Sequence, residues 1–328
     1  MHIDFRPALS AVRRQKLETS DADTGSLLWR RISIIHAHDA SSFVWTAVAP
    51  AVFVVLWSSG FIGGKLGLRY AEPLTFLGVR FAIATIVMLV AALVARAEWP
   101  KGVMIAHVAV VGLLMHGLQL GGVFSAIQIG LPAGFAAMII GLQPILIAAV
   151  VGPILGERVS SLQWIGFILG FGGAALVLGE RYGLSAGPVG LTAPALAVCG
   201  LIGGTAGTLY QKRFCAHANL WTATVIQYAA ATVPVMLLAA RLETMAITWS
   251  LPFIAALAWL VLALSVGAIC LLYLLIRRGA VSKLASYFFL VPPTTALIAW
   301  AMFGEHLGPQ ALVGMAIATI GVAVVQKG

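Results

Sequence analysis

Long apolar segments separated by short polar connections fill the chain after residue 42. A helix needs about 20 predominantly apolar residues to cross the hydrocarbon core of a bilayer. The sequence therefore predicts ten transmembrane helices, near residues 43–64, 74–95, 102–126, 132–155, 162–179, 192–212, 220–240, 252–275, 283–303 and 309–326. The expected fold class is all-α and integral to the membrane.

A hairpin motif occurs twice, at a constant offset of 148 residues. The first copy consists of Gln143-Pro144, Gly156-Glu157, Gly166 and Gly173, and the second of Pro292-Pro293, Gly304-Glu305, Gly314 and Gly321. At the start of each half, Lys65 matches Lys212 and Phe81 matches Tyr228. These matches predict that five helices at 42–179 repeat as five helices at 192–328. Five is odd, so the second copy is inverted, and such repeats place a shared site near mid-membrane and allow alternating access.

The prolines of the motif lie near the middle of apolar runs. Pro144 and the pair Pro292-Pro293 each remove a helical backbone donor, which kinks the helix and frees carbonyls such as that of Ile140. Kinked helices at matched points of two repeats indicate a transporter's binding cavity. The alternative is a kink that only helps packing.

Composition and charge exclude several classes of protein. Of the 328 residues 61% are hydrophobic and only 9% are charged, which is not typical of a soluble domain. The net charge of +9 does not indicate a nucleic-acid partner, because loops on the cytoplasmic side of a membrane protein are enriched in lysine and arginine. Cys199, Cys215 and Cys270 have spacings that fit no metal site or disulfide framework, so we expect neither metal nor cofactor.

The basic residues also predict the orientation of the chain. Residues 1–41 form a basic tail without a long apolar run, and we expect this tail to be cytoplasmic. The outer side then carries only Lys65, Arg69, Arg181 and Arg241, Arg80 lies inside a helix, and all other basic residues lie on the inner side. This bias predicts a multi-pass protein of a bacterial-type inner (plasma) membrane with both termini in the cytoplasm.

Several of these motifs resemble a known family. Trp57-Ser58-Ser59-Gly60-Phe61 leading to Lys65, Pro73 before Arg80-Phe81, and the doubled hairpin motif are similar to the drug/metabolite transporter superfamily, and within it to ten-helix EamA-type exporters. The resemblance covers about residues 45–326. As a whole, the sequence is most similar to aromatic amino-acid exporters of this family. It implies a secondary transporter that moves small metabolites outward through a cavity between helices 1, 3, 4, 6, 8 and 9. In the second half, Gln227 occupies the position that corresponds to Arg80. Any role that the family gives to this arginine therefore applies to Arg80 only.

The candidate substrate-binding residues are polar or aromatic side chains on the predicted helices: Trp57, Ser58, Arg80, His116, Gln119, Gln143, Thr205, Thr208, Tyr210, Tyr273, Ser286 and Tyr287. Each has a structural alternative. Arg80 could meet a substrate carboxylate, but it lies about two turns from its helix start, which favours an arginine that reaches the outer interface or bonds helix-end carbonyls. His116 is the candidate proton carrier, and the alternative is a neutral histidine hydrogen-bonded to a neighbouring helix. The other polar groups are equally suited to interhelical hydrogen bonds.

The paired glutamates Glu157 and Glu305 are expected to cap helices rather than to carry protons. Ser160 and Gln163 form a predicted capping box. The segment Gly60–Lys65 lacks the residues of a phosphate-binding loop, so ATP hydrolysis is not supported. A membrane-embedded enzyme would need a catalytic pair or metal ligands at membrane depth, and a sensor or scaffold would need no cavity.

We therefore expect a secondary exporter of small amphipathic metabolites, with neutral and aromatic amino acids as the favoured cargo. Aromatic walls suit an apolar body, amides and hydroxyls suit a zwitterionic head, and sugar phosphates would need more fixed positive charge. Exporters of other metabolites or drugs are the alternative. The expected partners are the substrate and the lipid bilayer, with no nucleic acid, and a monomer suffices.

Overall fold

A computed structural model describes residues 48–131, 136, 139–182, 190–303 and 307–328. The chain divides into two compact units, Met1–Ala49 and Pro50–Gly328. The predicted tail at 1–41 and Glu305 lie outside the described residues. The second unit contains the predicted transmembrane region and is described below.

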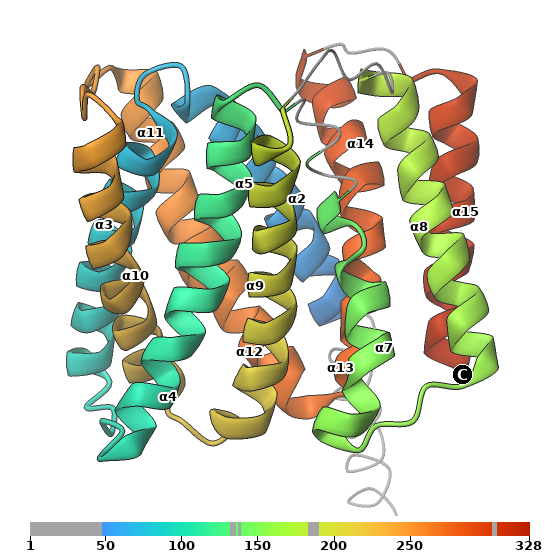
Figure 1. Cartoon of the computed structure of the whole chain (residues 1–328), viewed down its shortest axis with the longest axis horizontal. Coiled ribbons are helices and arrows are strands. Elements are labelled where there is room, and N and C mark those ends of the chain that lie inside the picture. The colour runs from blue at the N-terminus through green and yellow to red at the C-terminus, as the bar shows by residue number, and fades with distance from the viewer. Residues whose placement is uncertain (1–47, 132–135, 137–138, 183–189, 304–306) are drawn as a thin grey trace, which may run out of the picture. The chain divides into compact units, whose positions relative to one another are not determined.

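The second unit is built from helices (Figure 1). In chain order these are α2 (Ala49–Gly67), α3 (Pro73–Val94), α4 (Val103–Gly112), η2 (Leu113–Leu118), α5 (Gln119–Gln128), α7 (Gln143–Leu155), α8 (Ser161–Tyr182), α9 (Thr192–Phe214), α10 (Leu220–Leu242), α11 (Leu251–Trp259), η3 (Leu260–Ala268), α12 (Ile269–Arg278), α13 (Val281–Ser286), η4 (Tyr287–Leu290), α14 (Val291–Phe303) and α15 (Pro309–Lys327). Among the described residues, eight continuous helical segments are long and apolar enough to cross a membrane, and two shorter apolar helices, in α2 and α7, accompany them. Among the described residues the only β pairing is one isolated bridge, Ala71 to Ile247. These segments confirm the predicted ten-helix membrane fold.

Two long helices each contain a π-helical segment, at matched points of the two repeats. The segment η2 separates α4 from α5, and η3 separates α11 from α12. With the hairpin offset of 148 residues, Leu113–Leu118 corresponds to positions within Leu260–Ala268. π-helical turns are rare and are frequent at functional sites. Hydropathy gave no sign of them, because the extra residue per turn leaves the apolar composition unchanged.

The prolines of the repeated motif lie in first helical turns. Residues Gly141 and Leu142 form a turn, and α7 begins at Gln143 with Pro144 next to it. The predicted continuous helix 132–155 was therefore wrong across that turn. In the second repeat, η4 ends at Leu290 and Pro292-Pro293 follow in the first turn of α14. A proline is well suited to a first turn, where its missing N–H would have no helical partner.

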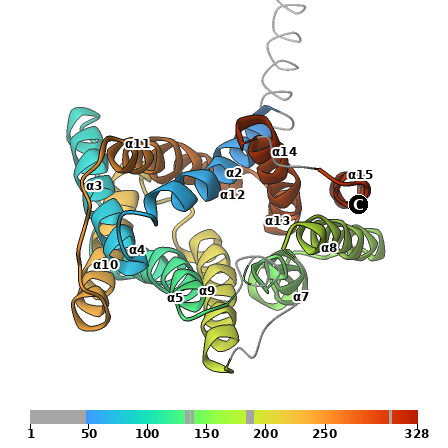
Figure 2. The same ribbon diagram turned by 90° about the horizontal axis from the view of Figure 1, so that it is seen from above.

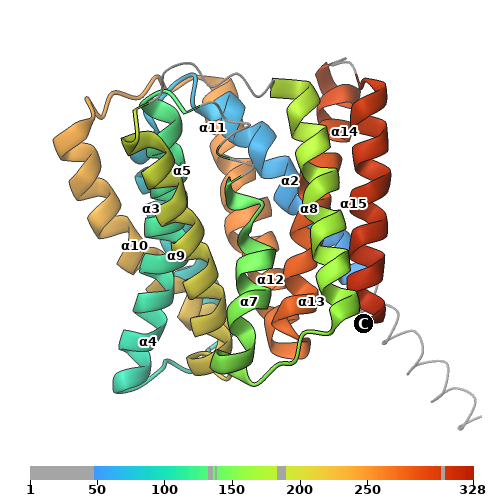
Figure 3. The ribbon, with the colours of Figure 1, turned by 45° about the vertical axis from the view of Figure 1, so that its right-hand side comes forward.

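The last helices of the two repeats, α8 and α15, cross at glycines of the repeated motif. Figure 3 shows them side by side and antiparallel. A Cβ atom on Gly166 would lie 2.7 Å from the carbonyl oxygen of Gly321, and one on Gly314 would lie 2.7 Å from that of Gly173. In repeat numbering Gly166 corresponds to Gly314 and Gly173 to Gly321. The two contacts are therefore one contact repeated about a local pseudo-twofold axis, as an inverted repeat requires.

The two ends of the helical unit differ in charge. One end, called here the basic end, carries Arg96, Lys101, Arg158, Lys212, Arg213, Arg277, Arg278, Lys283 and Lys327 at or near helix termini. The opposite end carries Lys65, Arg69, Arg181 and Arg241. Viewed from above, α3 and α10 pack at one side of the unit and α8, α14 and α15 at the other (Figure 2).

Candidate functional site

A buried polar cluster forms where α3, η2, α10 and η3 meet. Arg80 on α3 is only 7% exposed, and its Nε donates to the hydroxyl of Ser265 on η3 at 3.0 Å. The hydroxyl of Tyr228 on α10 donates to the carbonyl of the same serine at 2.9 Å. Arg80 therefore does not reach the interface, and the expectation that it would was wrong. Helix η3 supplies both acceptors and holds the guanidinium between the repeats.

The charge of Arg80 has no acidic partner among the described residues. Its Nε bond to Ser265 is its one hydrogen bond in that part of the chain. The terminal Nη1 and Nη2 atoms donate to no described residue. A buried cation is costly without a counter-ion. The cluster thus presents unused donors of a fixed positive charge at membrane depth.

His116 lies on η2 and stacks on Tyr228, with ring centroids 4.5 Å apart. The ring of Phe81 stacks on the same Tyr228 ring, with centroids 5.7 Å apart. The Nε2 atom of His116 is buried and has no hydrogen-bond partner in the described chain. The Nε2 atom therefore bonds no neighbouring helix among the described residues, and the ring packs by stacking on Tyr228.

Two predicted amides meet directly. Gln119 at the start of α5 donates from Nε2 to the Oε1 of Gln143 at the start of α7, at 3.0 Å, and both side chains are buried. Farther along α5, Gly121 is buried, as is Gly64 on α2. A Cβ on either glycine would meet no described atom within 4 Å. The described residues thus leave space beside α2 and beside α5, where Gly121 is two residues from Gln119.

Trp57 joins an aromatic group that links α2 to η4. Its ring lies 5.3 Å from that of Phe288, edge-on, and 5.3 Å from that of Phe53. The next residue, Ser58, is buried, and its hydroxyl donates to the carbonyl of Val291 at 3.3 Å. Trp57 itself remains half-buried, so part of its ring is available for contact.

Other predicted residues have their polar groups occupied within the protein. The hydroxyls of Thr205 and Thr208 donate to carbonyls of their own helix, those of Leu201 and Gly204. The remaining four make other contacts. Ser286 donates to the Lys283 carbonyl and accepts from Gln326, and Tyr210 pairs with His107 near the basic end. Tyr273 faces the Met115 sulfur, and Tyr287 packs against the α8–α15 core. No hydrogen bond between described residues joins these six residues to the Arg80 cluster, and their role in substrate binding stays a prediction.

Sequence reasoning missed Ser265 and Tyr228 as members of the cluster. Tyr228 had a usable signal, because it matches Phe81 in the repeat alignment. Ser265 had none, since a lone serine in an apolar run carries no pattern. A second buried pair, Gln227 Nε2 to Gln211 Oε1 at 3.1 Å, was missed for the same reason.

Cross-helix hydrogen bonds to carbonyls join neighbouring helices at the basic end. Lys212 at the end of α9 donates from Nζ to the carbonyls of Ile276 at 2.6 Å and Gly279 at 3.0 Å, where α12 ends. Arg213 donates to the Ile154 carbonyl of α7. Cations are well placed at helix C-termini, where carbonyls lack helical partners.

Carboxylates cap helix N-termini at both ends. Glu157 accepts from the backbone N–H groups of Val281 at 2.9 Å and Ser282 at 3.3 Å, at the start of α13. At the opposite end, Glu243 accepts from Leu74 and Thr75 at the start of α3, at 2.7 Å each. Ser160 and Gln163 form the predicted reciprocal pair before α8, as separate bonds of 3.2 and 2.9 Å.

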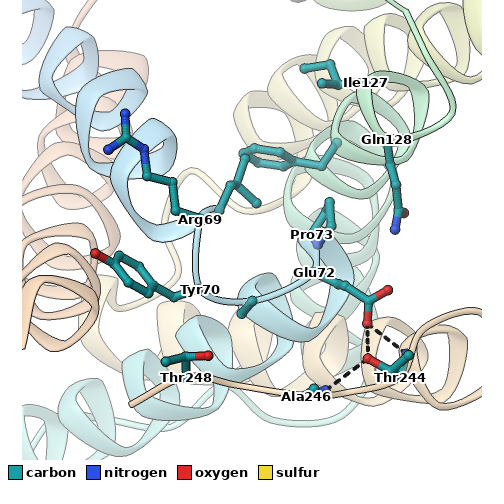
Figure 4. A pocket seen from close by; sticks show the side chains of 12 residues that line it. Arg69, Tyr70, Glu72, Pro73, Ile127, Gln128, Thr244, Ala246 and Thr248 are labelled. Carbon is teal, nitrogen blue, oxygen red and sulfur yellow. Dashed lines mark hydrogen bonds between the residues drawn. The ribbon is translucent and has the colours of Figure 1, made fainter. Parts of the chain in front are cut away.

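A shallow cavity lies at each end of the unit. The cavity at the end opposite the basic end has about 500 Å³ and includes Arg69, Tyr70, Glu72 and Thr244 (Figure 4). Glu72 turns toward Thr244, whose N–H and hydroxyl donate to its Oε2 at 2.7 and 2.6 Å. The cavity at the basic end has about 530 Å³ and is lined by residues 98–100, 217–221, Met104 and Arg277. Most residues that line the first cavity correspond, through the repeat offset of 148 residues, to residues that line the second. The two cavities therefore occupy equivalent positions of the two repeats.

Comparison with known proteins agrees with this architecture. The sequence profile of the EamA-like transporter family matches the chain twice, at residues 44–179 and 191–326. The uncharacterized transporter YvbV of Bacillus subtilis (strain 168) is 27% identical over 288 residues, which are 85% of this chain and 91% of that protein.

Two further relatives have similar coverage. The uncharacterized inner membrane transporter YedA of Escherichia coli (strain K12) is 25% identical over 84% of this chain and 88% of its own length. A probable terminal-alkyne amino-acid exporter of Streptantibioticus cattleyicolor is 25% identical over 88% of this chain and 94% of its own.

A solved crystal structure shares the fold, with a TM-score of 0.73 at 17% identity over 85% of this chain and 96% of that one. That likeness concerns the fold alone. The doubled profile match, the inverted helical repeat and the ten apolar segments agree, and the chain is a multi-pass membrane transporter that belongs to the EamA-like transporter family of the drug/metabolite transporter superfamily.

Proposed function

We propose that this transporter exports neutral amino acids, including aromatic ones, by alternating access. The observation that carries this proposal is Arg80, a buried cation with two free terminal nitrogens and no acidic partner in the described chain. A guanidinium with free donors suits a carboxylate, which it binds through two parallel hydrogen bonds. The substrate then supplies the missing counter-ion.

Other buried residues offer groups that suit the rest of the substrate. The Gln119–Gln143 pair offers amide donors and acceptors for the amino and carboxylate groups. The half-buried ring of Trp57, beside Phe288, offers an aromatic wall for an apolar side chain. One relative is a probable amino-acid exporter by name, which favours the same cargo class.

Proteoliposomes that contain the purified protein test this proposal. Counterflow of labelled phenylalanine or threonine is expected for the wild type, and phenylethylamine, which lacks the carboxylate, should compete at least tenfold more weakly. Arg80→Gln should raise the half-saturating phenylalanine concentration by roughly tenfold or more, and Arg80→Lys by less. Arg241→Gln, at an exposed position near the end of α10, is the matched control.

The phenylethylamine comparison uses the unmodified protein, so it separates loss of carboxylate binding from a folding defect. If a phosphorylated or cationic compound moves while neither amino acid does, the proposed cargo class is wrong. If Arg80→Gln leaves the half-saturating concentration unchanged in a folded protein, the carboxylate is bound elsewhere.

We further propose that the basic end faces the cytoplasm of a bacterial-type inner membrane, with both termini on that side. The excess of lysine and arginine at this end supports that orientation. Single cysteines at Arg158 and Thr244, in a background without the three native cysteines, should react with a membrane-impermeant maleimide from opposite sides. Labelling of both from one side would contradict the inverted topology.

A further inference from the structure

The basic-end cavity has a lining unlike that of its counterpart at the other end. It lies where the 95–102 connection, the start of α10 and the end of α12 meet. Its volume of about 530 Å³ is sufficient for a small headgroup. The charged and aromatic side chains that line it are those of Glu98, Trp99, His217, Trp221 and Arg277.

Arg277 supplies a positive charge to the wall of this cavity. It is half-buried, and one terminal nitrogen donates to the carbonyl of Ala218. Its Nε is buried without any hydrogen-bond partner in the described chain. Such an unsatisfied N–H is rare in proteins, so the described residues leave this guanidinium incompletely hydrogen-bonded. A guanidinium edge that lines a cavity fits an oxyanion such as a phosphate.

The two tryptophans indicate where the oxyanion comes from. Trp99 is 43% exposed and Trp221 is half-buried, and both line the same cavity as Arg277. Tryptophan gathers at membrane–water interfaces because its ring is apolar and its N–H is polar. Basic pockets between transmembrane helices at this depth bind phospholipid headgroups. A lipid phosphate is therefore favoured over a free anion.

Glu98 narrows the class of lipid. Its exposed side chain lines the same cavity as Arg277, where a carboxylate opposes an anionic headgroup but attracts an ammonium. We propose that this cavity binds the headgroup of an amine-bearing zwitterionic phospholipid, with the phosphate on Arg277 and the ammonium toward Glu98. In the counterpart cavity Arg69 is exposed and Glu72 is already bonded to Thr244, so that cavity has no comparable unsatisfied donor.

Native mass spectrometry of the detergent-purified protein, with defined lipids added back, tests the site. An ethanolamine phospholipid should bind with at least tenfold higher affinity than a glycerol phospholipid of net negative charge. Inorganic phosphate and phosphoethanolamine, which lack acyl chains, should not compete at equal concentration. Arg277→Gln should lower the ethanolamine lipid affinity about tenfold, Arg277→Lys should lower it less, and Arg69→Gln is the matched control at the opposite cavity.

Glu98→Gln leaves Arg277 in place and keeps the test valid if the arginine variants do not fold. It should remove the preference for the ethanolamine lipid over the acidic one. Equal affinity of the wild type for both lipids would overturn the zwitterion assignment. Equal competition by phosphoethanolamine would overturn the lipid assignment, and unchanged binding in folded Arg277→Gln would overturn the site.

Discussion

Phe81 and Tyr228 occupy equivalent positions of the two repeats, and their rings stack on each other with centroids 5.7 Å apart and planes 27° apart. Two equivalent residues can touch only where the pseudo-twofold axis passes close to both. The residue before each of them differs, Arg80 in one repeat and Gln227 in the other. The fold is thus nearly symmetric at this point, whereas the charge is not. This difference places one positive charge at the centre of a symmetric frame.

The glycine crossing of α8 and α15 should be sensitive to one added methyl group. A Cβ on Gly173 would lie 2.5 Å from the carbonyl oxygen of Gly314, which is rigid backbone. Gly173→Ala is expected to lower the free energy of unfolding by about 1–3 kcal/mol, as overpacking does. Gly172→Ala on the same helix meets no described atom within 4 Å and should be neutral or stabilising. Thermal unfolding in one detergent compares the two, and equal effects would contradict the close crossing.

Glu157 should act through its cap on α13 and not through a proton. Glu157→Ala removes the acceptor for the N–H groups of Val281 and Ser282, and it should cost about 1–2 kcal/mol of stability. Glu157→Gln keeps one acceptor oxygen and should retain most transport at every pH tested. Arg158→Ala, exposed and adjacent, is the control. Loss of pH dependence in Glu157→Gln with normal stability would instead identify a proton carrier.

Lys212 should hold the basic end closed. Lys212→Met removes the bonds from Nζ to the carbonyls of Ile276 and Gly279 while it keeps most of the side-chain volume. A cysteine introduced at buried Leu209, on the same helix, should then react with a small maleimide severalfold faster. Lys101→Met, at an exposed position of the same end, should leave the rate unchanged. An unchanged rate in Lys212→Met would show that other contacts close this end.

Transport should be independent of sodium. No aspartate or glutamate lies in the middle of a described helix, so a sodium ion has no charged ligand there. Replacement of sodium by choline should leave phenylalanine counterflow unchanged, and a collapse would contradict this prediction.

If protons are coupled to transport, the carrier is expected to be His116. His116→Gln should then flatten the pH dependence of net efflux and spare exchange. His107→Gln, which alters a histidine already paired with Tyr210, is the matched control. An equal loss of pH dependence in both variants would show that the effect is not specific to His116.

Chemical labelling of the native Cys215 should be slow at neutral pH. Burial raises the pKa of the Cys215 thiol to about 11, so little thiolate exists near neutral pH. Maleimide should react slowly with Cys215 at pH 7 and faster as the pH rises toward 11. Mass spectrometry of tryptic peptides measures this, and fast labelling of Cys215 at pH 7 would show that the thiol is exposed.

The sequence by itself determined the helices and their duplication. Apolar segments of membrane-spanning length must become helices in a bilayer, because no other segment satisfies its own backbone there. The hairpin spacing from Pro144 to Gly173 and from Pro292 to Gly321 then identified the repeat, and five helices per copy made it inverted. The capping box at Ser160 and Gln163 was equally readable, since it depends only on neighbours three residues apart.

Only the tertiary structure decided which polar groups meet. A transmembrane helix is apolar on every side, so its hydrophobic pattern does not reveal which face is buried against protein. The sequence therefore could not predict that Arg80 meets Ser265, 185 positions later, or that His116 stacks on Tyr228. It likewise could not predict the π-helical segments or the unsatisfied Nε of Arg277, because both result from how distant helices pack.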